Sequence, residues 1–501
     1  MSTDGSMKEV CAALAIKGKM PGALGNGLLA LIEYSQQVMN EGTAVEEELA
    51  ALTASRRIVR PVLEAKMQAR LDVLDKNSAG KTQCPDCHAR VDSQGRRARR
   101  WNSTLGPLHL KRRYSLCGGC GQRVAQSQKA LGLSESDFTP RLEEATTMMA
   151  TTVPFGMATK LVEILCGIEV SVKAVEMMVE RRGEEVLSLC DAEAKLISPY
   201  DETGLPVAEQ LRPGDMVPIK DIPKVAYLEI DGVIPLTRVE LNDDELTPQE
   251  KRRITRAKKT KARGGKGRRY RIVGREVKNA VLYDGKDCTP LSPGRGCILK
   301  KTYVSHLGEW GTFAQLLIVE LFRLRFDKSK LLVILSDGAE WIRSLAAWLP
   351  FKTLLILDLF HVKKRIWEVA HSLYGEHAAK ASQWAHSQCE RIEKGHVEKV
   401  IEALRFLKVE RPETRKLVNE LAGYFVNNKD RMDYPSYWAR GLRVGSGAVE
   451  SANFHVTGNR LILQGMRWSA DGARIMAVLR ADLFNERWES RTRQLLTLAA
   501  A

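Results

Sequence analysis

Residues 225–232 read VAYLEIDG, an apolar run of strand length that ends in an aspartate and a glycine. Residues 331–338 have the same form, LLVILSDG. Short apolar runs with such ends predict buried strands, so Asp231 and Asp337 are expected where two strands finish. Carboxylates at strand ends can converge although the sequence separates them widely, and their oxygens are the ligands that hard divalent cations prefer.

A third acid, Glu450, follows the glycine-rich stretch GSGAV at residues 445–449. The stretch predicts a helix start with Ser446 as its cap. Asp231, Asp337 and Glu450 together predict a site that binds two Mg²⁺ or Mn²⁺ ions for phosphodiester chemistry. A glutamate in a first helical turn is also stabilised by the helix dipole without any catalytic role, so the two aspartates are what make Glu450 a candidate ligand.

The segments around these acids predict an α/β fold. Strand-like runs lie at 225–235, 279–284, 297–306, 331–336 and 353–358, and helices are expected at about 309–325 and 339–348. Three strands followed by alternating helices and strands predict a mixed sheet. Residues 361–440 read as helices that interrupt the sheet domain before Glu450.

The last of these strands ends at Asp358, and His361 follows at the junction to a helix. A carboxylate and an imidazole three residues apart could contact a phosphate or hold the geometry of the site. Taken alone, a histidine in this position is more typical of a structural, hydrogen-bonded side chain.

Four cysteines form two Cys-x-x-Cys pairs, Cys84 with Cys87 and Cys117 with Cys120. This double-knuckle spacing predicts one structural Zn²⁺ held by four thiolates in a zinc-ribbon-like module. A short segment with few apolar residues gains its folding free energy from such a metal. His88 could replace one sulfur, and two unrelated cysteine pairs are the alternative.

The chain is strongly basic, with a formal net charge of +16. A surplus of this size favours a polyanionic partner, first of all nucleic acid, although a basic enzyme without such a partner can have the same composition. The candidate DNA contacts gather in two places. In the cysteine module they are Arg96, Arg97, Arg99, Arg100, Lys111, Arg112 and Arg113, and in the segment 251–271 they are Arg252, Arg253, Lys258, Lys259, Arg268 and Arg269.

The segment 251–271 holds twelve Lys or Arg residues and no acid. Such a block repels itself and predicts a mobile loop that orders on a polyanion. It lies between the first two candidate strands, close in sequence to Asp231. Phosphate contact near the active site is one interpretation of this segment, and a solubilising loop is the other.

Composition divides the chain into successive regions. They are an N-terminal helical region (1–75), the cysteine module (76–125), a second helical region (126–198), a linker (199–222), the α/β domain (223–490) and a tail (491–501). Residues 155–186 are similar to a helix-turn-helix, but an ordinary helical hairpin has the same pattern. Neither a signal peptide nor a membrane-spanning run is evident, so a soluble cytoplasmic protein is expected.

Six segments carry a resemblance to a known family. They are LEIDGV (228–233), REVK (275–278), SDGAEWI (336–342), LDLFH (357–361), GSGAVESA (445–452) and GMRWS (465–469). In order and spacing they resemble bacterial insertion-sequence transposases of the DDE type, in the Kra-type group related to the Mutator-like superfamily. The resemblance implies a ribonuclease H-like core with an all-helical insertion. It also implies Asp231, Asp337 and Glu450 as the metal-binding triad, with Asp358 and His361 as an accessory pair.

Residues and resemblance together predict a DNA transposase of an insertion sequence, associated with the nucleoid in a bacterial cytoplasm. It would cut the element ends and join their 3′-hydroxyls to target DNA. The expected partner is double-stranded DNA, as terminal inverted repeats and as target, and a homo-oligomer is expected because two ends have to be brought together. Two alternatives stay open: a ribonuclease H-like nuclease without strand transfer, and a transposase-derived regulator that binds DNA without catalysis.

Overall fold

The chain forms two compact units in a computed structural model, residues 1–182 with 489–501 and residues 183–488. The structure describes residues 43–77, 83–84, 86–133, 136–197, 221–242, 244–259, 270–292, 295–349 and 351–500, with residues 25, 27, 31 and 34. Most of the N-terminal helical region before residue 43 and most of the predicted linker at 199–222 lie outside the described residues. The sequence-based domain boundaries therefore stay predictions.

The first unit contains a long hairpin packed on a helix. Helix α3 (Ala44–Asn77) precedes an antiparallel sheet in the order β1 (Val91–Ser103), β2 (Gly106–Cys117) and β3 (Arg123–Val124). Trp101, Leu108 and Leu110 of the hairpin bury themselves against Leu71 of α3. This small cluster is the apolar support of the cysteine module, because sheet faces need such burial to be stable.

Side chains of α3 also cover the open edge of β2. Backbone N–H groups at alternate positions of β2 donate to acceptors spaced along one face of the helix. The pairs are His109 to Glu64 Oε2 (2.8 Å), Lys111 to Gln68 Oε1 (2.7 Å) and Arg113 to Asp75 Oδ2 (3.2 Å). The helix thereby satisfies donors that an edge strand otherwise leaves open to other chains.

Further helices of the first unit follow the sheet. They are α4 (Gln126–Ala130), α5 (Pro140–Thr152), α6 (Phe155–Cys166), α7 (Val172–Ile197), which ends in the second unit, and α19 (Trp488–Ala500). Gly167, in the left-handed region at φ +65°, ends α6. The hydroxyl of Ser171 accepts a hydrogen bond from Ala174 N (3.2 Å) at the start of α7. The pair of helices expected at 155–186 is present, and its contact with DNA stays a prediction.

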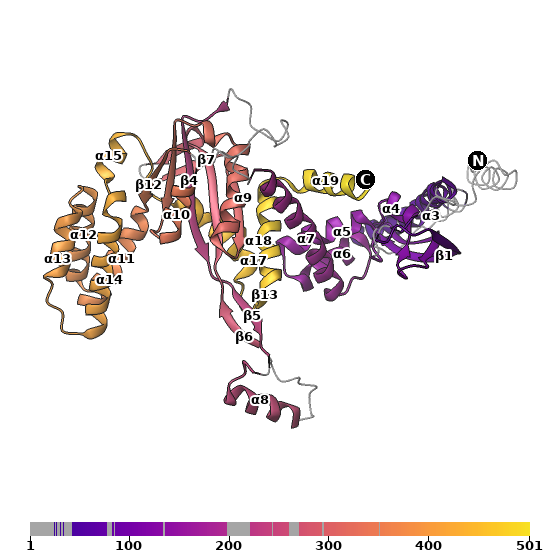
Figure 1. Cartoon of the computed structure of the whole chain (residues 1–501), viewed down its shortest axis with the longest axis horizontal. Coiled ribbons are helices and arrows are strands. Elements are labelled where there is room, and N and C mark those ends of the chain that lie inside the picture. The colour runs from indigo at the N-terminus through magenta and orange to yellow at the C-terminus, as the bar shows by residue number, and fades with distance from the viewer. Residues whose placement is uncertain are drawn as a thin grey trace. The chain divides into compact units, whose positions relative to one another are not determined.

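The second unit is built on a five-stranded mixed sheet, so the mixed α/β class is confirmed. Its order is β10 (Thr302–Leu307), β7 (Val277–Asp284), β4 (Val225–Val233), β11 (Leu331–Ser336) and β12 (Thr353–Leu357). The first three strands are antiparallel neighbours, and β11 runs parallel to both β4 and β12. Figure 1 shows helices on both faces of this sheet.

Alternate residues of β4 enter two different cores. Leu228 and Ile230 pack with Phe313 of α9 (Trp310–Arg323) and with side chains of α10 (Glu340–Trp348). Tyr227 faces the opposite core, which contains Val362 of α11 (Leu359–Tyr374) and Val449 of α16 (Gly447–Ala452). Because successive strand residues point to opposite faces, Glu229 and Asp231 belong to the face of Tyr227, under α11 and α16.

Between Asp337 and Glu450 the described chain is mostly helical, as expected for 361–440. The helices after α11 are α12 (Ala379–Glu393), α13 (Val397–Arg405), α14 (Pro412–Asn428) and α15 (Tyr434–Ala439), shown in orange in Figure 1. After α16 come a π-helix η8 (Asn453–Gly458), α17 (Asn459–Leu461) and α18 (Ala470–Phe484). The strand expected at 297–306 is two strands, since β9 (Arg295–Ile298) pairs with β8 (Cys288–Ser292) before β10 begins.

The loop predicted for 251–271 is wrong in its first part. Helix α8 (Pro248–Lys259) lies between β5 (Leu236–Glu240) and β6 (Tyr270–Gly274), which join β13 (Trp468–Ser469) in a small sheet. Thr247 and Glu250 form a capping box, with Thr247 N to Glu250 Oε2 at 2.8 Å and Glu250 N to Thr247 Oγ1 at 3.3 Å. Lys and Arg are good helix formers, so a cap outweighs their mutual repulsion here.

In the part of the chain that the structure describes, no helix has both the length and the apolar character that crossing a membrane requires.

Candidate active site

The register of the parallel strands determines where three aspartates lie. Ile230 of β4 pairs with Ser336 of β11, and Ser336 pairs with Leu357 of β12. The next residues along the chain are Asp231, Asp337 and Asp358. Parallel strands end at the same edge of a sheet, so this register brings the three acids to neighbouring positions in the order of the strands.

Glu450 comes to the same place from a helix. It lies in the first turn of α16, which packs on β4 and β7. Burial raises the pKa of Glu450, and the negative charges of Asp358 and Asp231 raise it further. Ser446 stands before this helix as predicted, but its hydroxyl makes no capping bond and donates to Asp358 instead (2.6 Å).

The side chain of Asp358 is fully buried and surrounded by donors. Its Oδ1 accepts from Phe360 N (3.0 Å) and Ser446 N (3.1 Å), and its Oδ2 accepts from His361 Nδ1 (2.5 Å) and the Ser446 hydroxyl. Burial acts to raise its pKa, but the hydrogen bonds from His361 and Ser446 outweigh burial, and the pKa is lowered. Asp358 therefore joins the start of α11 to the segment before α16.

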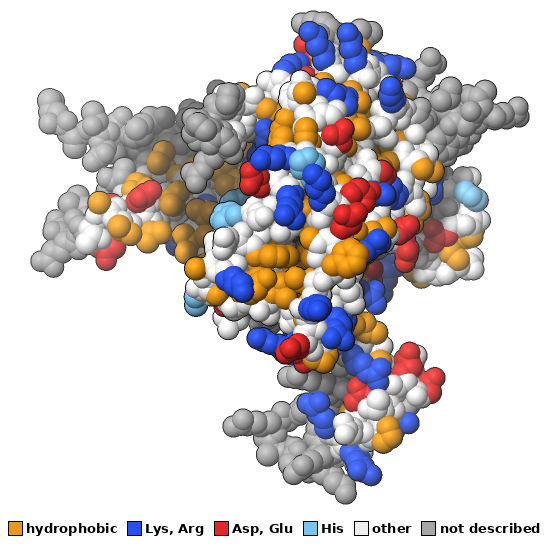
Figure 2. All heavy atoms as spheres, turned by 90° about the vertical axis from the view of Figure 1, so that its left-hand side faces the viewer, with side chains coloured by type: hydrophobic (Ala, Val, Ile, Leu, Met, Phe, Trp, Pro, Cys, Tyr) orange, Lys and Arg blue, Asp and Glu red, His pale blue; other side chains and the backbone are white. Residues whose placement is uncertain are grey.

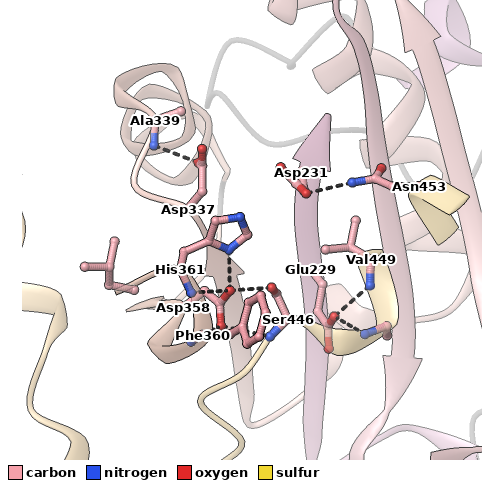
Figure 3. Close-up of polar contacts among 12 residues, drawn as sticks. Glu229, Asp231, Asp337, Ala339, Asp358, Phe360, His361, Ser446, Val449 and Asn453 are labelled. Atoms are coloured by element: carbon pink, nitrogen blue, oxygen red, sulfur yellow. Dashed lines mark hydrogen bonds and ion pairs between the residues drawn. The ribbon is translucent and has the colours of Figure 1, made fainter. Parts of the chain in front are cut away.

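His361 lies between Asp231 and Asp337. Its hydrogen bond to Asp358 raises the pKa of the imidazole, and the charges of Asp231 and Asp337 add to this effect. Figure 3 shows the ring between the side chains of Asp231 and Asp337. Because Asp358 holds Nδ1, the other ring nitrogen, Nε2, is the one left to meet a ligand.

Asp231 and Asp337 carry fewer hydrogen bonds than Asp358. Asp231 Oδ2 accepts from Asn453 Nδ2 (2.6 Å), and the Gly232 amide also donates to this carboxylate. Asp337 Oδ1 accepts from Ala339 N (3.0 Å). Burial raises the pKa of Asp231, and the nearby charge of Asp337 raises it further.

The donor set fits hard divalent cations. Carboxylates that are crowded together repel one another, and a nearby cation relieves this repulsion. Among the described residues, the tightest cluster of potential ligand atoms at this site is Asp358, His361 and Glu450, within 4.8 Å of one another, and not the predicted triad. Asp358 is nevertheless a poor ligand, because five donors already occupy its oxygens, including His361 N to Oδ2 at 3.3 Å, whereas Asp231 and Asp337 keep coordinating capacity.

Sequence reasoning missed a fifth acid near the site, Glu229. It is fully buried and accepts hydrogen bonds from the Tyr283 hydroxyl (2.6 Å), Ala448 N (2.9 Å) and Val449 N (2.9 Å). Burial raises the pKa of Glu229 to about 6. The available signal was a lone charged residue inside an otherwise apolar strand, since such residues are buried only with partners.

A second missed group connects Asp231 to the sheet. Asn453, which donates to Asp231, accepts through Oδ1 from Asn279 Nδ2 (2.6 Å), and Asn279 also donates to Thr457 (3.0 Å) and accepts from Ser305 (2.7 Å). Asn453 and Thr457 are in the π-helix η8. A π-helical turn is often found at functional sites, but a short asparagine-containing segment carries no such signal in sequence.

The four cysteines of the first unit come together as predicted. Their sulfur atoms lie within 4.8 Å of one another, with Cys84 to Cys120 and Cys87 to Cys117 both at 3.4 Å. Zn–S bonds of about 2.3 Å place tetrahedral sulfurs roughly 3.8 Å apart, so the cluster fits zinc. The backbone at Cys120 donates to Cys117 and lowers its pKa to about 6, which favours the thiolate that a metal needs.

The basic candidates of the hairpin differ in what they contact. Arg96 pairs with Asp72 and with Asp75, Arg99 pairs with Asp137 and lies over Trp101, and Arg112 is buried. These three hold the module together. Arg97 is exposed and stacks on Tyr114 at 4.2 Å, while Arg100 and Lys111 are exposed and Arg113 is half-buried. The last four are the side chains that a polyanion can reach.

The basic candidates of the second unit are only partly described. Arg252 and Arg253 are exposed on α8. Figure 2 shows Lys and Arg side chains on the part of the molecule at the bottom of the view, where α8 lies in Figure 1. Arg268 and Arg269 and the side chains of Lys258 and Lys259 lie outside the described residues.

A match to a known protein family covers part of the chain. Residues 303–493 match an uncharacterised protein family, UPF0236. This range includes Asp337, Asp358 and Glu450 and leaves out Asp231. A search of the curated proteins found no match.

Among solved structures, the chain is similar to one described as the Drosophila P element transposase strand transfer complex. The TM-score is 0.24 at 12% identity, covering 74% of this chain and 83% of that chain. A likeness of this strength carries no argument about fold or function.

Proposed function

We propose that the protein is a DDE-type DNA transposase of an insertion sequence, as the resemblance of its motifs implies. The observation that supports the proposal is that Asp231 and Asp337 follow paired residues of two adjacent parallel strands, and that Glu450 is near enough to Asp231 for the charge of Asp231 to raise the pKa of Glu450. Two divalent cations bound there would stabilise the attacking and leaving oxygens of phosphodiester cleavage and strand transfer.

The topology of the sheet supports a ribonuclease H-like core. Three antiparallel strands are followed by parallel strands on the other side of β4. The helices α11 to α15 stand between Asp337 and Glu450, where the resemblance implies an all-helical insertion.

The chain's own residues have separate roles in this proposal. Asp231 and Asp337 present carboxylates from adjacent strands, and Glu450 presents one from a helix. Nε2 of His361 is available to donate to a phosphate oxygen when the ring is protonated, which its raised pKa favours. Asp358 touches no substrate and holds His361 in place, as a carboxylate behind a histidine commonly does.

DNA recognition is assigned to the first unit. The zinc module presents Arg97, Arg100, Lys111 and Arg113, which would contact the phosphates of terminal inverted repeats. A homo-oligomer is proposed because one transposition event needs two element ends in the same complex.

The test is a cleavage and strand-transfer assay. Purified protein with Mg²⁺ or Mn²⁺ is incubated with labelled DNA that carries the element ends, beside the Asp231→Asn, Asp337→Asn and Glu450→Gln variants. Joined products from the parent protein that are lost in all three variants are expected. Cleavage without joining would indicate a nuclease instead, and DNA binding without either would indicate a regulator.

A further inference from the structure

The helix that carries Glu450 is held by the rest of the molecule. Helix α16 (Gly447–Ala452) continues directly into η8 and α17, so the helical stretch covers residues 447–461, and a helix of this length is only marginally stable on its own in water. Its N-cap residue Ser446 gives its hydroxyl to Asp358 and leaves the first turn uncapped by local side chains. The direction in which Glu450 points therefore depends on contacts from outside the helix.

Glu229 supplies those contacts at the first turn. Its Oε2 accepts from both Ala448 N and Val449 N at 2.9 Å, and these amides have no partner inside a helix. Val449 is the residue before Glu450. On the other side, Glu229 is two residues before Asp231 and on the same face of β4. One carboxylate thus links the backbone beside Glu450 to the strand that bears Asp231.

The second oxygen of Glu229 is held as well. Oε1 accepts from the hydroxyl of Tyr283 on β7 at 2.6 Å, and burial raises the pKa of this tyrosine so that the hydroxyl stays protonated. Tyr283 also stacks on Tyr227 with ring centroids 5.1 Å apart. Tyr283 therefore fixes the orientation of the Glu229 carboxylate, whose other oxygen accepts from α16.

A buried carboxylate is a costly way to fill space. Replacing buried charged groups by apolar side chains of similar volume is often neutral or stabilising, so stability alone does not explain a fully buried acid in a central strand. Geometry does explain it, because a carboxylate oxygen can accept two adjacent amides and fix a helix start in one orientation.

We propose that Glu229 is a positioning residue that sets Glu450 opposite Asp231 by holding the first turn of α16. The inference rests on the proposed function, since it assumes that Glu450 is a metal ligand. It adds a residue that contacts neither metal nor DNA and acts only through α16.

Two variants test separately the length of the Glu229 side chain and its charge. Glu229→Gln keeps the length of the side chain and an acceptor oxygen for both amides, and its NH₂ group can donate to Tyr283. Glu229→Asp keeps the charge, but its shorter side chain does not reach both amides. We expect Mn²⁺ binding, measured by calorimetry without DNA, to weaken about 10–100-fold in the Asp variant, the usual effect of losing an outer-shell partner. The Gln variant should stay within a few-fold of the parent.

Controls separate this inference from the proposed function. Tyr283→Phe keeps the ring and both amide contacts and should bind Mn²⁺ almost as the parent does. Glu450→Gln should weaken binding strongly, and Glu229→Asp added to Glu450→Gln should weaken it no further, because both changes act through one ligand. A parent protein that binds no Mn²⁺ would refute the proposed function itself.

Thermal unfolding and DNA binding are measured on every variant, because a merely structural role would change stability and leave Mn²⁺ affinity in the folded protein unchanged. If the Asp variant does not fold, Glu229→Met, of similar length and without an acceptor, replaces it with the same expectation. Parent-like Mn²⁺ affinity in the folded Asp or Met variant, while Glu450→Gln loses it, would overturn the inference. So would a loss in the folded Gln variant.

Discussion

Asp337 and Asp358 end neighbouring strands and yet have different environments. The carboxylate of Asp337 is half-buried and accepts one hydrogen bond, from Ala339 N, while that of Asp358 is fully buried and accepts from five donors. A carboxylate without spare lone pairs holds structure, and one with spare lone pairs can bind a cation. This difference supports Asp337 as the second acid of the triad.

The difference predicts opposite phenotypes for two matched substitutions. Asp337→Asn should leave the melting temperature nearly unchanged and reduce cleavage by more than the roughly 10–100-fold typical of an outer-shell partner. Asp358→Asn places an NH₂ group among donors and should destabilise the fold by about 1–3 kcal/mol. Thermal unfolding and the cleavage assay together measure both. An Asp358→Asn protein as stable as the parent would contradict the assignment.

The buried side chain of His306, the residue after Ser305, predicts a pH dependence of stability. Burial, with the charges of Arg474 and Lys278, lowers its pKa to about 4, so the ring is neutral in the folded protein. The unfolded chain binds the proton below about pH 6.5. Stability present above pH 6.5 should therefore fall as the pH drops toward 4, by at most about 2 kcal/mol between pH 6.5 and 5.

Denaturant unfolding at pH 7.5 and pH 5 measures this effect. A His306→Asn variant cannot take up the proton and should lose less stability over the same interval than the parent does. Equal losses in the two proteins would show that other groups cause the pH dependence.

At the scale of elements, the cysteine end of the module has little apolar support apart from the cluster of Trp101, Leu108 and Leu110 on α3. Its own buried cluster consists of Cys84, Val91, Cys117 and Val124. A core of this size contributes little stability, so the bound metal should supply most of it. The neighbouring helix α3 contributes the edge contacts to β2 but does not touch the four sulfur atoms through any described hydrogen bond.

We predict one zinc ion per chain and a module that loosens without it. Cys117→Ser should lower the zinc content and increase hydrogen exchange in β1 and β2, while the sheet of the second unit keeps its protection. Cys297→Ser, which changes an exposed thiol outside the cluster, is the matched control. Elemental analysis that finds no zinc in the parent protein would rule out the metal.

At the scale of the whole molecule, the net charge of +16 predicts salt-dependent DNA binding. Arg100→Ala and Lys111→Ala should each weaken binding at all DNA sequences and lower the salt slope by about one. Lys416→Ala removes an exposed charge from α14 and should change little. Fluorescence anisotropy across a salt series measures the slopes, and unchanged slopes in both hairpin variants would exclude this face from DNA contact.

Much of the second unit was predictable because its signals are local. Apolar runs such as 225–230 and 331–336 carry enough strand character to be recognised without their neighbours. The start of α8 was missed although Thr247 and Glu250 form a capping box, because the high density of positive charge suggested disorder. The capping role predicted for Ser446 is wrong, because its hydroxyl donates to Asp358 and the amides of Ala448 and Val449 donate to Glu229 instead.

The sequence by itself determined the strand that ends just before Asp337, the helical segment after α11 and the four zinc-like cysteines, since each depends on local patterns in the chain. The strand end predicted at Asp231 is wrong by two residues, because β4 continues to Val233 in its pairing with β7. Only the tertiary structure decided which acids keep coordinating capacity and which are saturated. Strand register aligns Ile230, Ser336 and Leu357, and a slip of one residue would turn every side chain of a strand to the other face. Glu229 accepts hydrogen bonds from two amides of α16 that lie 219 and 220 positions further along the chain. No local sequence pattern encodes a contact between residues so far apart.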